Sequence, residues 1–198
     1  MGGCQATLSG GGIYTLESPL TMTDCTVSGN QAERGGGLWA GLAAALDLTN
    51  CTIANNQSHG EGGGLALQES QADLSACTFA GNSAVTNGGG GLSLREGLLT
   101  FGNTIVAGNN APFDPNLGNF QSKVFTTGPN LTNGMPLLAP LGLYGGRTQT
   151  MPPLPGSPVL GTAGAGMPRH DQRGFPRRIA AASDVGAVEG VFKPTGQR

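Results

Sequence analysis

The chain has 198 residues with 10 basic and 12 acidic side chains, which is enough for one domain with a buried core but gives a net charge of only -2. Charged residues make up 11% of the sequence, against the usual ~25%, so no strong field attracts nucleic acid and we exclude it as a partner. The 36 glycines follow no Gly-X-Y period and 37% of the residues are apolar, which excludes collagen and a disordered chain.

The first residues show no targeting signal. They contain neither the basic start nor the apolar stretch of a signal peptide, and Ala6 stands where myristoylation needs Ser or Thr. No segment approaches the ~20 apolar residues of a membrane span. Because the chain opens inside repeat-like sequence, we expect Met1 to begin a fragment, and export cannot be judged from this end.

Residues 10–110 repeat a unit of about 26 residues. A Gly-Gly-Ile or Gly-Gly-Leu block begins at residues 11, 36, 63 and 90, so the intervals are 25, 27 and 27. A second block begins 13 or 14 residues after the start of each glycine block: Asp24–Asn30, Asn50–Asn56, Ala76–Asn82 and Asn103–Asn109. The unit alternates like short strands, lacks a helical period, and is too short for a propeller blade of ~40 residues. The pattern predicts an all-β, right-handed parallel β-helix, with the hand taken from the general rule for parallel crossovers.

Stacking of coils places equivalent residues in columns. Three inward apolar columns are predicted: Ile13, Leu38, Leu65 and Leu92; Met22, Leu48, Leu74 and Phe101; Val27, Ile53, Phe79 and Val106. These columns form the expected core.

Two further columns carry polar or reactive groups. Cys25, Cys51 and Cys77 form one, closed by Thr104. A metal or redox site is the alternative, but we favour a ladder of small buried thiols. Disulfides between them are disfavoured, because parallel side chains are poorly placed to cross-link.

The other column holds Asn30, Asn56, Asn82 and Asn109. A glycan or calcium site is the alternative here, and we interpret the column as stacked amides hydrogen-bonded between coils.

Outward positions supply the candidate binding residues. Tyr14 and Trp39 are predicted to share an outward column in neighbouring coils, where aromatic rings can stack on sugars, and they are the candidate glycan contacts. The alternative is that a loop or the C-terminal segment covers them. A threonine column, Thr26, Thr52 and Thr78, is similar to the flat arrays of ice-binding β-helices, although strand propensity alone explains it.

The sequence offers little for catalysis. Glycoside hydrolysis needs two carboxylates converging at roughly 5 to 9.5 Å. Asp47 and Asp73 are predicted to stack in adjacent coils, but Thr21 and Thr100 interrupt the column, and His59 lies in a turn. We therefore expect no catalytic residue, no cofactor and no metal ligand.

The C-terminal part departs from the repeat. Residues 111–136 are predicted to form one or two irregular coils, with Val124, Phe125 and Leu131 supplying core. The proline-rich residues 137–189 then fold over the end of the solenoid or lie along its flank, which protects exposed backbone. Ion pairs among Asp171, Arg173, Arg177 and Asp184 are expected to hold the segment.

These motifs resemble known bacterial sequences. The Gly-Gly-Leu and Phe79–Asn82 blocks resemble the repeats of bacterial β-helix surface proteins, including the polymorphic outer membrane protein type. The C-terminal motifs resemble, in order, the choice-of-anchor Q domain: Leu138–Leu141, Tyr144–Thr148, Leu154–Pro158, Asp171–Arg177 and Asp184–Glu189.

The resemblance implies a pectin lyase-like solenoid at 1–136, a choice-of-anchor Q-like cap at 137–190 and a tail at 191–198 without an anchor pattern. It also implies an exported or cell-surface bacterial protein with a structural or adhesive role and a cell-surface or extracellular polysaccharide as partner. The alternative is a polysaccharide-acting lyase or glycoside hydrolase. The oligomeric state stays open.

Overall fold

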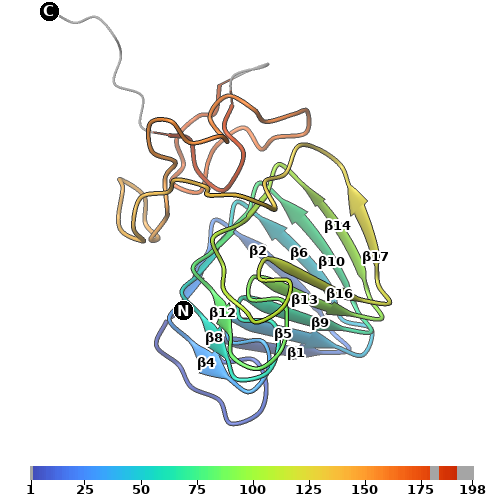
Figure 1. Ribbon diagram of the computed structural model, residues 1–198. Helices are drawn as coiled ribbons and strands as arrows, with labels where there is room; N and C mark the ends of the chain where they lie inside the picture. The colour runs from blue at the N-terminus through green and yellow to red at the C-terminus, as the bar shows by residue number, and fades with distance from the viewer. Residues whose placement is uncertain (1, 179–182, 191–198) are drawn as a thin grey trace, which may run out of the picture.

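A computed structural model describes residues 2–178 and 183–190, and its regular structure is entirely β (Figure 1). The first sheet contains β1 (Ile13–Leu16), β5 (Leu38–Gly41), β9 (Leu65–Gln68), β13 (Leu92–Arg95) and β16 (Leu117–Phe120). The second contains β2 (Pro19–Thr23), β6 (Ala45–Thr49), β10 (Gln71–Ser75), β14 (Leu98–Gly102) and β17 (Lys123–Thr126). The third contains β3 (Thr26–Ser28), β7 (Thr52–Ala54), β11 (Thr78–Ala80) and β15 (Ile105–Val106). The fourth contains β4 (Gln31–Ala32), β8 (Gln57–Ser58) and β12 (Ser83–Ala84). No helix in the described part of the chain could cross a membrane.

The first three coils each contribute one strand to all four sheets, and every pair of neighbouring strands is parallel. The corner between the second and third sheets shows how the sequence bends the chain. Asp24, Asn50 and Asn103 occupy this corner in three coils with φ of 54°, 50° and 53°. Asp and Asn adopt this left-handed conformation more readily than other residues that carry a Cβ atom. Ala76 occupies the same corner in the third coil at φ 51°. The stacking of coils therefore imposes the left-handed turn even where the sequence supplies neither Asp nor Asn.

The three predicted inward columns are confirmed. Leu38 pairs with Ile13 and Leu65 in the first sheet, and their equivalents in the second and third sheets are aligned in the same way. The buried members of all three columns belong to one core, against which Ile13 packs at the N-terminal end. One prediction was wrong: Phe125 does not supply core but is 56% exposed. Val124 takes the inward position beside Leu99, so the next residue of the strand must point outward.

The asparagine column forms a continuous buried amide ladder. Asn56 accepts hydrogen bonds from the backbone N and Nδ2 of Asn30 at 3.1 and 3.0 Å. Its own Nδ2 donates to the carbonyl of Val27 at 2.9 Å and to Oδ1 of Asn82 at 3.0 Å. The same pattern continues through Asn109 to Asn116. The amides thus satisfy one another and the backbone between coils, as the interpretation of the column required.

The cysteine column lies inside the solenoid as predicted. Cys51 and Cys77 are buried, Cys25 is partly buried, and Thr104 closes the column by accepting a hydrogen bond from the backbone N of Cys77 at 3.1 Å. A hydrogen bond with Cys77 and burial raise the pKa of the Cys51 thiol, and burial raises the pKa of Cys25. All three are free thiols.

We expect thiol labelling of the folded protein to follow this burial, because the reactive form of cysteine is the accessible thiolate. A maleimide reagent should modify the exposed Cys4 first and Cys25 more slowly. Cys51 and Cys77 should react only after denaturant is added. Mass spectrometry of peptides from timed samples measures this order. Labelling of Cys51 as fast as that of Cys4 would contradict an inert ladder.

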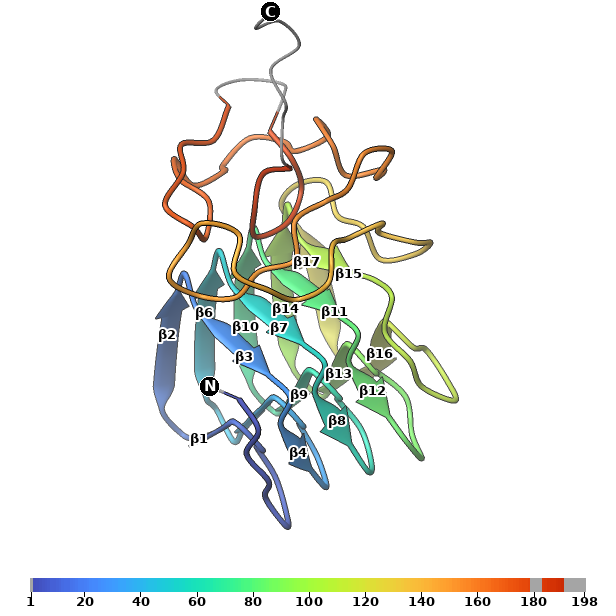
Figure 2. The same ribbon diagram turned by 90° about the vertical axis from the view of Figure 1, so that its left-hand side faces the viewer.

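The C-terminal segment lies along the flank of the solenoid, which decides between the two predicted placements (Figure 2). We call its described part, residues 137–178 and 183–190, the strap. It crosses the outer face of the third sheet: Thr26 donates to the carbonyl of Gln149 at 2.5 Å, and the backbone N of Gly186 donates to the carbonyl of Asn103 at 2.9 Å. The strap therefore spans coils from the first to the fourth, and the tail 191–198 lies outside the described residues.

Candidate functional site

The two candidate glycan contacts lie together on the outer face of the first sheet. Tyr14 and Trp39 are register partners, and their rings stack with centroids 4.7 Å apart and planes 9° from parallel. Tyr14 is 54% exposed, whereas Trp39 is only 8% exposed. The alternative that a loop or the strap covers both residues does not hold for Tyr14, which is exposed, and the ring of Tyr14 itself covers one face of the Trp39 indole.

The burial of Trp39 follows from small neighbours. A Cβ atom at Gly41 would lie 2.0 Å from Cη2 of Trp39, so the indole lies directly over this glycine. In the next coil its register partner is Ala66, which leaves room for the ring. Trp39 is thus a support for Tyr14, and only the tyrosine ring is presented to solvent. The prediction of a shared outward column is confirmed, and a glycan contact remains a prediction that now rests on Tyr14.

A second cluster occupies the far end of the same face. Arg95 on β13 pairs with Glu61 at 3.3 Å and lies 5.1 Å from the ring centroid of Phe120 on β16. Ser93 also donates to Glu61 at 3.4 Å. The first sheet therefore presents an aromatic group at each end, with an ion pair beside the second.

Asp47 and Asp73 are register partners on the outer face of the second sheet, as predicted. Thr21 and Thr100 flank them in the same column, also as predicted. Both carboxylates are exposed and, in the described part of the chain, neither has a side-chain hydrogen bond or ion pair. Acid–base chemistry requires carboxylates held by positioned partners, and among the described residues neither of these two has one.

Within the described ranges 2–178 and 183–190, no three His, Cys, Asp or Glu side chains lie close enough together to hold a metal ion.

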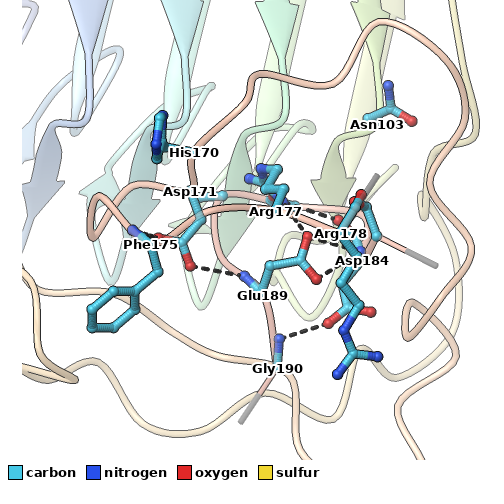
Figure 3. Close-up of polar contacts among 12 residues, drawn as sticks. Asn103, His170, Asp171, Phe175, Arg177, Arg178, Asp184, Glu189 and Gly190 are labelled. Carbon is cyan, nitrogen blue, oxygen red and sulfur yellow. Dashed lines mark hydrogen bonds and ion pairs between the residues drawn. The ribbon is translucent and has the colours of Figure 1, made fainter. Parts of the chain in front are cut away.

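The strap is held by a buried polar network, shown in Figure 3. Asp171 is fully buried and pairs with Arg173 at 2.6 Å, as the sequence predicted. Its carboxylate also accepts hydrogen bonds from the backbone N of Arg173, Phe175 and Glu189 at 2.9, 3.2 and 3.1 Å. Asp171 therefore ties the loop around it to the end of the strap.

Arg177 is the centre of the second half of the network. It donates to the Glu189 carboxylate at 3.2 Å and to the Asn50 side chain of the second coil at 3.0 Å. The predicted role of Asp184 needs correction, because its carboxylate accepts the backbone N of Gly161 and Gly190, each at 2.6 Å. The acidic partner of Arg177 is Glu189, which stands in the same C-terminal motif but was not singled out.

Burial dominates the electrostatics of this pair. It raises the pKa of Glu189, an effect that the charge of Asp184 reinforces and that of Arg177 opposes. Burial also lowers the pKa of Arg177, while the neighbouring carboxylates oppose that shift. Each charge therefore offsets part of the cost of burying the other.

The threonine column lies beneath the strap. Thr52 donates to Oε1 of Gln172 at 2.5 Å, and Gln172 donates to Thr26 at 2.9 Å. Thr78 accepts the backbone N of Ala187 at 3.0 Å. A flat, solvent-facing threonine array is therefore ruled out. A role for Gln172 was not predicted from the sequence, because this residue is neutral and stands between the charged residues Asp171 and Arg173, which were the predicted contacts.

The parallel coils and their stacked columns define a β-solenoid. Residues 1–112 match the family model described as a right handed beta helix region, and the chain belongs to that family. Neither the curated proteins nor the solved structures contain a match to this chain.

Proposed function

We propose that this chain is a non-catalytic, exported or cell-surface β-helix protein of bacterial origin, with a structural or adhesive role that includes glycan binding. Support comes from the C-terminal motifs that resemble the choice-of-anchor Q domain and from repeats that resemble those of bacterial surface proteins. In this proposal the strap is the choice-of-anchor Q-like segment, and extracellular polysaccharide is the partner.

One observation carries the glycan-binding part of the proposal. The Tyr14 ring is half exposed yet fixed in orientation by its stack on the buried Trp39. A rigid aromatic side chain offers a large contact area at low entropic cost on binding, and its hydroxyl can hydrogen-bond. Stacking on the apolar face of a sugar ring is the interaction that this geometry supports.

We expect the purified chain to be retained on insoluble polysaccharides from a panel of neutral and acidic types, without release of new sugar ends. Tyr14→Ala should lower the affinity roughly tenfold, which corresponds to the loss of one stacking contact of about 1.4 kcal/mol. Phe125→Ala is the matched control, because that ring is 56% exposed on the second sheet and should leave retention unchanged. Equal loss in both variants, or retention on none of the polysaccharides, would contradict the proposal.

The register pair of Asp47 and Asp73 supports a second candidate, a polysaccharide-acting enzyme. Release of new sugar ends in the same assay, abolished by Asp73→Asn, would favour this candidate over the first. Retention without release would favour the binding protein.

A further inference from the structure

A long groove follows the outer face of the fourth sheet, away from both Tyr14 and the strap. One hollow of about 680 Å³ is lined by residues of the first coils, among them Gln5, Gln31 and Gln57. A second hollow of about 390 Å³ continues past Ser83 and Asn110. The two hollows share Gln57 and Val85 and so form one groove along the solenoid axis.

The floor of this groove carries one hydrogen-bonding side chain per coil. Gln31 pairs with Gln57 in register, and Gln57 pairs with Ser83. Isolated bridges extend the column to Gln5 at one end and Asn110 at the other. Strand spacing places successive members of the column ~4.8 Å apart. The groove thus offers a regular row of amide and hydroxyl groups.

These groups are available for a ligand. Gln5 donates to Oε1 of Gln31 at 3.1 Å, and the amide nitrogen of Gln31, which lines the groove, has no partner in the described part of the chain. The exposed Gln57 side chain has no hydrogen bond to any described residue. In contrast, the buried asparagine ladder of the same coils is fully hydrogen-bonded. The two amide columns therefore differ: the asparagine ladder holds the coils together, whereas the glutamine column has amide groups available to a ligand.

The chemistry of the groove selects the class of ligand. Its ionisable side chains are Glu33 and His59, so the charge is too small to attract a polyanion or polycation. Its apolar groups are small, with Val85 the largest of them, and give no pocket for the large side chains that anchor peptides. Neutral amides both donate and accept, which matches the hydroxyl groups of sugars.

We infer that this groove binds a neutral polysaccharide chain, which lies along the solenoid axis and hydrogen-bonds to Gln31 and Gln57. The inference rests on the proposed glycan binding but places the main contacts on a different face from Tyr14. The groove would then set specificity for uncharged chains.

The test titrates ¹⁵N-labelled protein with neutral hexasaccharides of β-1,4-glucose, β-1,4-mannose and α-1,4-glucose, and with acidic hexagalacturonate. The side-chain amide signals of Gln5, Gln31 and Gln57 should shift with at least one neutral chain. Gln57→Met and Gln31→Met should each weaken binding roughly fivefold, the value of one net hydrogen bond of ~1 kcal/mol. Gln71→Met is the matched control, because Gln71 is an exposed strand residue of the second sheet.

The outcomes separate this inference from the proposed function. Shifts confined to the surroundings of Tyr14 would uphold glycan binding and overturn the groove as its site. Preference of the glutamine column for hexagalacturonate would overturn the neutral class of ligand. Absence of glutamine shifts with all three neutral chains would also overturn the inference, whatever the insoluble polysaccharides retain.

Discussion

Replacing Arg177 by methionine is expected to lower the free energy of unfolding by about 3 to 5 kcal/mol and to release the strap from the solenoid. The substitution keeps an apolar side chain of similar length but removes every hydrogen bond to Glu189, Asn50 and the carbonyl of Gly186. Glu189 would then be a buried carboxylate without a cation, and its pKa would rise further. The decrease in the free energy of unfolding should therefore exceed the decrease that follows removal of an ordinary surface ion pair.

Hydrogen exchange measures this result most directly. In the wild-type protein the backbone N of Ala187 donates to Thr78 and that of Gln172 donates to the carbonyl of Ala187, so both amides should exchange slowly. In Arg177→Met they should exchange much faster, whereas the amide of Phe79 in the core should change little.

Arg95→Met is the control for removal of an arginine from an ion pair. Arg95 contacts Glu61 with 43% of its side chain exposed, so its loss should cost about 1 kcal/mol or less. Similar losses in the two variants, or unchanged protection of Ala187 in Arg177→Met, would show that the network does not fasten the strap.

The solenoid could be predicted from the sequence because its contacts repeat. Each coil places one residue in each column, so the spacing of the glycine and cysteine blocks alone aligns Leu38 with Leu65 and Cys51 with Cys77. The same regularity made the asparagine ladder recognisable. Where alternation of the strand was overlooked, as at Phe125, the prediction of burial was wrong.

The contacts of the strap could not be predicted in the same way. Gln172 meets Thr52 across 120 positions and Cys25 across 147, and no period in the sequence connects these pairs. The charges of Asp171 and Arg177 indicated a network, but not that Glu189 and Asn50 complete it. The candidate site was predicted in part for a similar reason. The outward direction of Trp39 follows from its place in the repeat, whereas its burial depends on Gly41 and Ala66.

The second large effect is expected from Asn82→Asp, a change of one atom in the amide ladder. Nδ2 of Asn82 donates to the carbonyl of Ile53 at 2.9 Å and to Oδ1 of Asn109 at 3.0 Å. An ionised carboxylate at this fully buried position would point an oxygen at both acceptors. Loss of two hydrogen bonds together with burial of an unpaired charge should cost about 3 kcal/mol or more.

The cost of Asn82→Asp should depend on pH in a defined direction. Burial and the facing acceptors raise the pKa of the introduced carboxyl in the folded state, so the folded protein binds its proton more tightly than the unfolded chain does. Stability relative to the wild type should therefore be greatest below the ordinary Asp pKa of ~3.9 and should fall as pH rises through the higher folded-state pKa. Denaturant unfolding of both proteins at pH 4 and pH 7 measures the difference.

Asn55→Asp is the matched control, because Asn55 is exposed and has a φ of 55°, a conformation that Asp also tolerates. This substitution should change the stability by less than ~0.5 kcal/mol at either pH. A loss for Asn82→Asp that is equally small, or that grows as pH falls, would mean that the ladder does not hold the coils together through its amide donors.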